Sequence, residues 1–142
     1  MGQPEAALHR IHERYAKMMG YKDYTTLFEG WGIGVEGFGG GTINHAWSGG
    51  PLTMMSQKVV GIEPTSPAFE TFRVAPQLGK LKHAEASLVT ADGSRIRVAV
   101  EQDEQGRMTI RLEVPKGKKA QVVFPDGKTR NVGAGTHKLT GK

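Results

Sequence analysis

The stretch "RIRVAVEQDEQGRMTIRLEV", residues 95–114, holds two segments in which apolar and polar residues alternate. Residues 95–100 and 108–114 each place apolar side chains at every second position and arginine, threonine or glutamate between them. A period of two puts one kind of side chain on each face of an extended strand, as in antiparallel sheets with one buried face. The Gln105-Gly106 pair between the segments is a turn signal. We therefore predict two half-buried antiparallel strands.

Turn signals of the same kind recur along this part of the chain, at Asp92-Gly93, Gln105-Gly106, Lys116-Gly117 and Asp126-Gly127. Their spacing of about ten residues is typical of an all-β sandwich or barrel. From Phe69 onward we predict seven or eight short strands that form two antiparallel sheets packed face to face. The predicted core residues are Ile96, Val98, Val100, Ile110, Leu112, Val114, Val122 and Phe124.

Upstream of the strands, the period changes to that of a helix. Pro4 suits a first helical turn, Gly20 suits a C-terminal cap, and apolar residues recur three and four positions apart between them. We predict a helix over residues 4–20 and a glycine-rich loop over residues 21–41. A second predicted helix begins at Asn44 or Pro51 and runs to Val60, where Gly61 terminates it. Its predicted apolar stripe consists of Leu52, Met55 and Val59.

Together these segments predict an α+β fold. Two N-terminal helices joined by a glycine-rich loop are followed by an antiparallel β-sandwich of seven or eight strands. Pro64 and Pro67 mark a linker between the two parts. We therefore expect one domain over residues 1–63 and a second over residues 64–142.

Composition narrows the class of protein. The chain has 142 residues, 37% hydrophobic and 23% charged residues, and no cysteine. No apolar run approaches the roughly 20 residues that a membrane span needs, and no signal peptide opens the sequence, so we expect a soluble chain without a membrane partner. The absence of cysteine excludes disulfides and thiolate metal sites. The composition excludes neither the cytoplasm nor export as the compartment.

The net charge of +5 raises the question of nucleic-acid binding. The basic excess is mostly C-terminal: from Lys116 onward, lysines and Arg130 are spread through predicted turns and strand edges. Lysines in such places protect sheet edges from pairing with other chains. We therefore predict a solvated basic face and no nucleic-acid partner.

A glycine-rich motif at residues 32–37, "GIGVEG", matches the GxGxxG pattern of dinucleotide sites. Such a site needs a strand before the first glycine and a helix that starts at the third. Here a helix precedes the motif and further glycines follow it, so we predict no nucleotide site and no cofactor.

Aromatic, acidic and imidazole side chains surround these glycines: Phe28, Glu29, Trp31, Asn44, His45 and Trp47. Aromatic planes with one carboxylate and one titratable ring suit a pocket that stacks a sugar and activates a water. Taken singly, each residue also fits an ordinary role in a core, at a helix start or on a surface. The residue types alone leave the function open.

The order of several motifs resembles the end of bacterial α-L-rhamnosidases. The most specific are "TTLFEGW" at residues 25–31 and "NHAWSGGP" at residues 44–51. The resemblance continues through "VGIEP" (60–64), Phe69, "FRVAP" (72–76), Ala84 and "DGSRI" (92–96), and so covers nearly the whole chain. It implies that residues 1–63 are the last helices of a six-hairpin (α/α)6 catalytic barrel and that the rest is a C-terminal β-sandwich.

The resemblance also implies site residues. Glu29 falls at the position of the family's general base, which activates water for inverting hydrolysis of a terminal rhamnose. His45 falls at a sugar-contacting histidine, and Trp31 and Trp47 at pocket walls. Phe28 stands where the family more usually has tryptophan. The expected partners are a rhamnose-containing saccharide and the remaining barrel, and exposed helix faces would also allow self-association.

An inverting glycosidase needs a second carboxyl group, the general acid, about 6.5 to 9.5 Å from the base. In the family this acid lies far upstream of these motifs. Glu36, in a glycine-rich loop, and Glu13, on a helix, show no sign of the fixed geometry that a general acid requires. We therefore expect a C-terminal piece of a rhamnosidase that is inactive alone.

Two alternatives stand beside this prediction. His9 and His12 have a helical spacing that can chelate zinc, but no third ligand is evident, so we predict no metal site. The alternative function is a non-catalytic carbohydrate-binding or structural β-sandwich. Few stacking planes support sugar binding there, because no tryptophan or tyrosine follows Trp47.

Overall fold

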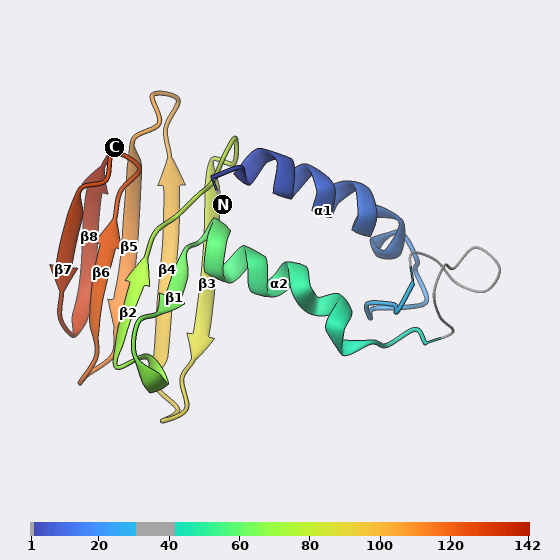
Figure 1. Ribbon diagram of the computed structural model, residues 1–142, viewed down its shortest axis with the longest axis horizontal. Coiled ribbons are helices and arrows are strands. Elements are labelled where there is room, and N and C mark those ends of the chain that lie inside the picture. Colours follow the sequence, from blue (N-terminus) through green and yellow to red (C-terminus); the bar gives the residue numbers. More distant parts are fainter. Residues whose placement is uncertain (1, 31–41) are drawn as a thin grey trace. The chain divides into compact units, whose positions relative to one another are not determined.

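The computed structural model describes residues 2–30 and 42–142, which form two compact units, Gln3–Met54 and Met55–Lys142. Trp31, Glu36 and the glycine motif at residues 32–37 lie outside the described residues. The described part holds two α-helices and eight strands, so the predicted α+β class is confirmed (Figure 1). None of its helices combines the length and apolar character that crossing a membrane requires.

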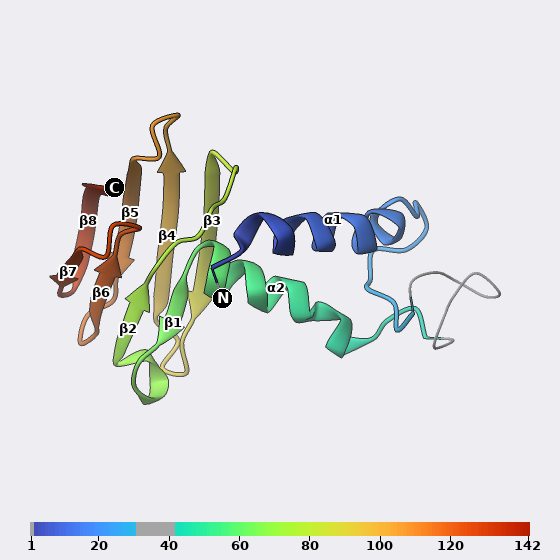
Figure 2. The same ribbon diagram turned by 45° about the horizontal axis from the view of Figure 1, so that its top comes forward.

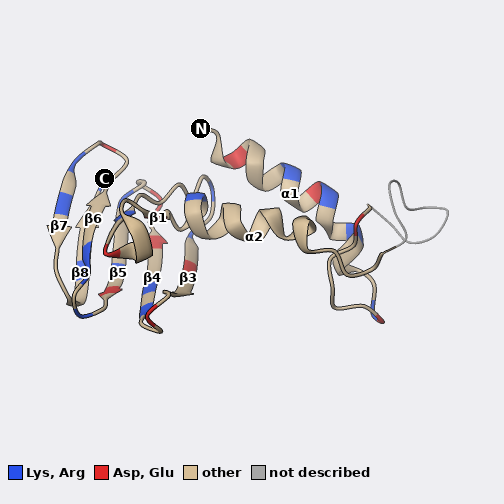
Figure 3. Ribbon diagram, turned by 60° about the horizontal axis from the view of Figure 1, so that its bottom comes forward, with Lys and Arg blue, Asp and Glu red and all other residues tan. Residues whose placement is uncertain are grey.

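The first unit begins with helix α1, Pro4–Met19, as predicted for residues 4–20. Pro4 stands in the first turn, where a missing amide hydrogen costs no intrahelical bond. At the other end the Gly20 amide donates to the carbonyls of Ala16 and Lys17, both at 3.1 Å. Figure 3 shows that charged residues recur along α1.

The second predicted helix is built from three short pieces: a 3-10 turn η2 (Ala46–Gly49), helix α2 (Gly50–Met54) and a π-helical turn η3 (Met55–Val59). Of its predicted apolar stripe only Val59 is buried, whereas Leu52 is 65% exposed and Met55 is 41% exposed. Leu52 is therefore not part of the hydrophobic core of the described residues. Figure 3 shows no charged residue on α2, and the two exposed large side chains nearby, Leu52 and Met55, are apolar.

The second unit is a β-sandwich of two four-stranded sheets. One sheet has the order β1-β2-β6-β7 and the other β3-β4-β5-β8, and Figures 1 and 2 show them as two layers. The strands are β1 (Ile62–Pro64), β2 (Thr71–Val74), β3 (His83–Val89), β4 (Arg95–Gln102), β5 (Met108–Val114), β6 (Lys119–Val123), β7 (Thr129–Val132) and β8 (Gly135–Gly141).

All strand pairs are antiparallel except β2 and β6, which pair in parallel with Phe72 opposite Ala120. After β2 the chain leaves its sheet, builds β3, β4 and β5 in the other layer, and returns as β6 beside β2. A crossover of this length allows a parallel pair, which a tight hairpin does not. Helical turn η4 (Pro67–Phe69) joins β1 to β2.

The stretch that defines the fold forms the β4–β5 hairpin, in which Val98 pairs with Leu112 and Val100 with Ile110. All eight predicted core residues are buried between the sheets. The core also contains Ile62, Phe72, Val74 and Leu78, which the sequence pattern did not predict. They come from β1, β2 and the segment after β2, where the strands are too short to display a clear period.

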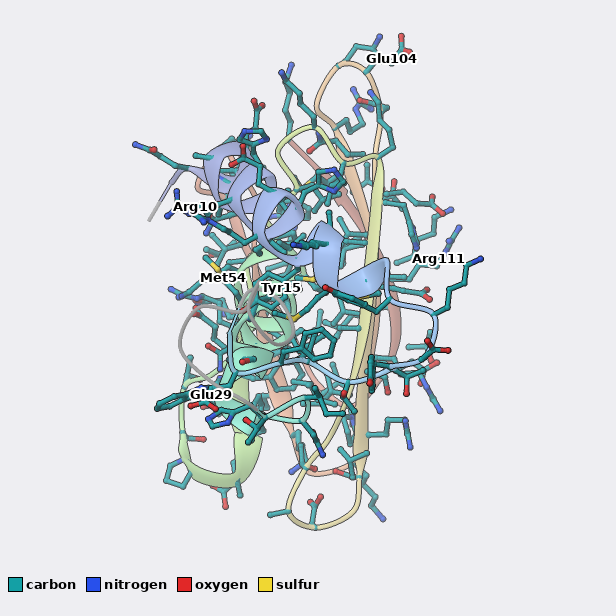
Figure 4. All side chains as sticks on the ribbon, turned by 90° about the vertical axis from the view of Figure 1, so that its right-hand side faces the viewer. Arg10, Tyr15, Glu29, Met54, Glu104 and Arg111 are labelled. Carbon is teal, nitrogen blue, oxygen red and sulfur yellow. The ribbon has the colours of Figure 1, made fainter. Side chains whose placement is uncertain are left out.

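Replacing Ile110 with alanine should strongly destabilise the sandwich. Ile110 is fully buried, and truncating such a side chain typically costs about 2 to 5 kcal/mol because a cavity remains. Its neighbour Arg111 lies on the outer face, where it points away from the sheet in Figure 4 and donates to Glu101 at 2.9 Å. An exposed ion pair contributes only about 0 to 1 kcal/mol. Thermal unfolding of Ile110→Ala and Arg111→Ala tests the strand assignment, which equal losses of melting temperature would contradict.

Candidate functional site

Two loop segments of the first unit, residues 26–29 and 42–48, are held side by side by backbone hydrogen bonds. The Glu29 amide donates to the Thr42 carbonyl at 3.0 Å, and the His45 amide donates to the Leu27 carbonyl at 2.8 Å. The Thr26 hydroxyl also donates to the Ile43 carbonyl. These contacts place the side chains of Glu29 and His45 in the same neighbourhood.

Glu29, Thr42 and His45 form a connected polar cluster. The Thr42 hydroxyl lies 2.9 Å from Oε2 of Glu29 and 2.9 Å from Nδ1 of His45. The His45 Nδ1 to Glu29 Oε2 distance is 3.8 Å, which is too long for a direct hydrogen bond. The side chains of His45 and Glu29 are 28% and 25% exposed, so both remain accessible.

Trp47 extends this cluster with an aromatic plane. Its ring centroid lies 4.6 Å from that of His45, with the planes tilted by 44°. Trp47 is 74% exposed, which is unusual for so large an apolar side chain. An exposed indole beside an imidazole and a carboxylate offers a stacking surface next to polar groups.

Phe28, by contrast, is buried, with only 1% of its surface exposed. Its ring packs against Tyr21 and Tyr24 at centroid distances of 5.4 and 5.9 Å, and its amide points to the Met18 sulfur at 3.3 Å. Within the described residues Phe28 therefore anchors the loop that carries Glu29. The contact of Phe28 with a sugar stays a prediction.

Sequence reasoning missed three residues that organise this region: Tyr15, Thr42 and Ser48. Ser48 is buried, and its hydroxyl donates to the Phe28 carbonyl at 2.5 Å. The Tyr15 hydroxyl donates to the Ser48 carbonyl at 3.1 Å, and burial raises the pKa of Tyr15 above its ordinary value. Figure 4 labels Tyr15 on α1 and Glu29 in the following loop. Apart from its position three residues before His45, nothing in the sequence marked Thr42.

Replacing Ser48 with alanine should loosen this loop. The change leaves the Phe28 carbonyl without its buried hydroxyl donor, which typically costs about 1 to 3 kcal/mol. Hydrogen exchange should then accelerate at the amides of Glu29 and His45, which bond across the two segments. Ser87→Ala, on the exposed face of β3, should leave these two amides unchanged. Unaltered exchange in Ser48→Ala would show that its hydroxyl does not hold the loop.

The described residues offer no third ligand for a zinc ion at His9 and His12. His9 lies 3.4 Å from Glu13 one helical turn away, and both side chains are largely exposed. Among residues 2–30 and 42–142, no group of three histidine or acidic side chains could hold a metal ion. Of the two glutamates considered as a general acid, Glu13 lies in this exposed pair with His9. Glu36 lies outside the described residues.

The chemistry available in the cluster is that of a proton acceptor. In the described part of the chain, Glu29 contacts Thr42 and His45 and no second carboxylate. A carboxylate with one donor and partial solvent access can accept a proton from a water molecule. The imidazole and indole beside it can contact a polar ring.

Solved structures give the fold a wider context. The chain is similar to an α-L-rhamnosidase from Aspergillus terreus, with 21% identity and a TM-score of 0.67 over 78% of this chain. It is also similar to the Streptomyces avermitilis α-L-rhamnosidase complexed with L-rhamnose, with 24% identity and a TM-score of 0.71 over 85% of this chain. The α-L-rhamnosidase from Dictyoglumus thermophilum is 20% identical, with a TM-score of 0.67 over 82% of this chain.

The chain spans only 14%, 14% and 16% of the length of these three structures, respectively. No curated protein matches the sequence. Residues 61–139, which include every strand of the sandwich from β1 to most of β8, match the family model of the bacterial alpha-L-rhamnosidase C-terminal domain. The match covers more than half of the sequence, and the chain therefore belongs to the bacterial α-L-rhamnosidase C-terminal domain family.

Proposed function

We propose that this chain is the C-terminal part of an inverting α-L-rhamnosidase and that Glu29 is its general base. The observation that carries the proposal is the cluster in which the Thr42 hydroxyl bridges Glu29 and His45. It gives one accessible carboxylate a fixed donor and a neighbouring imidazole. An inverting enzyme uses such a carboxylate to take a proton from the attacking water.

The same cluster supplies surfaces for the sugar. In the proposed site His45 hydrogen-bonds a sugar hydroxyl and Trp47 forms a wall, with Trp31 as a further wall. Protein sites for sugars combine aromatic planes with a few polar groups in this way. The Streptomyces avermitilis relative is complexed with L-rhamnose, which supports rhamnose as the sugar.

The general acid and the remaining pocket would come from other helices of the catalytic barrel. In this proposal residues 1–63 close that barrel and residues 64–142 form the appended sandwich. Leu52 and Met19 are strongly exposed in this chain, and barrel helices packed over them would remove that apolar surface from water. These helix faces could alternatively pair two copies of the chain.

The isolated 142-residue chain should not hydrolyse an aryl α-L-rhamnoside, because in the proposed mechanism the acid that protonates the leaving oxygen comes from other helices of the barrel. An enzyme that carries this chain at its C-terminus should hydrolyse the same substrate and release first β-L-rhamnose, the inverted anomer, detected by proton NMR. Release of the α-anomer first would contradict an inverting mechanism. Activity of the isolated chain that disappears in Glu29→Gln would reveal a second carboxylate within it, with Glu36 the first to test.

A further inference from the structure

We infer that the Thr42 hydroxyl fixes His45 in the tautomer that carries its proton on Nδ1, and thereby presents Nε2 as the acceptor for a sugar hydroxyl. Thr42 is a positioning residue: it acts through Glu29 and His45. The inference deepens the proposed function and rests on it for the identity of the ligand.

The assignment follows from counting protons. A threonine hydroxyl has one proton to donate, and an ionised carboxylate has none. The 2.9 Å contact between Thr42 Oγ1 and Glu29 Oε2 therefore requires Thr42 as donor. The hydroxyl oxygen can then only accept from His45, whose Nδ1 lies 2.9 Å away. Nδ1 must carry a hydrogen for this second contact to be a hydrogen bond.

The opposite arrangement is unfavourable. If Thr42 donated to an unprotonated Nδ1, its oxygen would face Oε2 of Glu29 at 2.9 Å with lone pairs on both sides. An unmade hydrogen bond to a charged group is costly in a partly desolvated site. His45 cannot bypass Thr42, because its Nδ1 lies 3.8 Å from Oε2.

Thr42 leaves two polar atoms of the cluster unengaged. Within the described residues, Nε2 of His45 and Oε1 of Glu29 have no hydrogen-bond partner. In the neutral imidazole with hydrogen on Nδ1, Nε2 is an acceptor and selects a hydroxyl donor. Oε1 is then the oxygen of Glu29 that receives the proton of water, since Thr42 occupies Oε2. The site thus offers two acceptors, one to a sugar hydroxyl and one to the attacking water.

The tautomer can be measured directly in the 142-residue chain by 15N NMR with labelled histidine, at a pH at which the ring of His45 is neutral. A His45→Asn variant identifies its signals among the five histidines. We expect the Nδ1–H form to predominate in the unmodified chain. Thr42→Val keeps the shape but removes the hydroxyl, and should shift His45 toward the Nε2–H form. Thr42→Ser should restore the Nδ1–H form.

Thr140→Val is the control, because it makes the same chemical change at an exposed position of β8, where the hydroxyl lies 3.5 Å from that of Thr109 and outside the Glu29 cluster. It should leave the His45 tautomer unchanged. Predominance of the Nε2–H form in the unmodified chain would overturn the inference even if Thr42→Val failed to fold. An unchanged tautomer in a folded Thr42→Val chain would overturn it as well.

A second measurement separates this inference from the proposed function. In an enzyme that carries this chain, Thr42→Val should lower kcat/KM for an aryl rhamnoside about 10- to 100-fold, as expected for losing a hydrogen bond to a charged group. Thr42→Ser should recover most of that loss. If the tautomer shifts as expected but the enzyme does not cleave rhamnosides, the proposed function fails and the Thr42 assignment stands. If cleavage depends on Glu29 but His45 carries Nε2–H, only the Thr42 assignment fails.

Discussion

Glu29→Gln should lower kcat of a rhamnosidase that carries this chain by about 10²- to 10⁴-fold, the usual contribution of a general base. Glutamine keeps the size of the side chain, and its amide oxygen can still accept the Thr42 hydroxyl that now bonds Oε2. The change removes the basic oxygen that takes the proton of water. KM for an aryl rhamnoside should therefore stay close to that of the unmodified enzyme.

The matched control for this variant is Glu13→Gln. It makes the same chemical change in the exposed His9–Glu13 pair on α1, outside the Glu29 cluster. Turnover of Glu13→Gln should equal that of the unmodified enzyme. Full activity of Glu29→Gln would remove the base assignment, and a large rise in KM at constant kcat would make Glu29 a binding residue.

The sandwich was predictable because its central strands are long and half-buried. In β4 and β5 every second residue enters the core, so the sequence itself displays the pattern of burial. The edge strand β1 has three residues, and β2 has four. Such short segments carry too few residues for a period, and the parallel pairing of β2 with β6 depends on the path of the whole chain.

The site was predictable in residue types and less so in their contacts. The sequence brings Glu29 and His45 to attention, but the Thr42 hydroxyl that joins them became evident only when the two loop segments lay side by side. A residue's burial is likewise set by distant packing. Phe28 resembles a pocket aromatic in the sequence, yet Tyr21 and Tyr24 enclose it.

Glu63, in the second unit, also makes contacts that the sequence does not reveal. The sequence places it in a motif shared with rhamnosidases, without indicating what it binds. In the structure Lys58 and Arg73 both donate to its carboxylate, and these hydrogen bonds lower its pKa. Glu63 thus ties β1 to the preceding helical turn and to β2. Such a role depends on residues brought together by folding, which spacing in the sequence does not reveal.

Gly61→Ala should destabilise the sandwich more than the same replacement at a glycine that has a similar φ but lies in an open turn. Gly61 precedes β1 and has a φ of +87°. A Cβ atom there would lie 2.3 Å from the carbonyl carbon of Ala75, 2.4 Å from its oxygen and 2.6 Å from the Pro76 nitrogen. These are backbone atoms, so no side-chain rotation relieves the clash. Relief requires separating two segments joined by the bond from the Ala75 amide to the Gly61 carbonyl, at 2.9 Å.

Gly93→Ala isolates the effect of the clash from that of the backbone angle. Gly93 has a φ of +78°, and a Cβ atom added there would have no other atom within 4 Å. Replacing Gly93 with alanine should lower the free energy of unfolding by about 1 to 2 kcal/mol, the penalty of a left-handed residue. Each kcal/mol corresponds to roughly 4 to 8 °C of melting temperature in a unit of this size. Gly61→Ala adds displacement of the β1–β2 edge and should exceed about 4 kcal/mol, a range reached only by severe core or backbone disruption. Thermal unfolding of both variants measures the difference. Equal losses would show that the Ala75–Pro76 backbone does not press against Gly61, and that the start of the sandwich is less tightly closed than its contacts require.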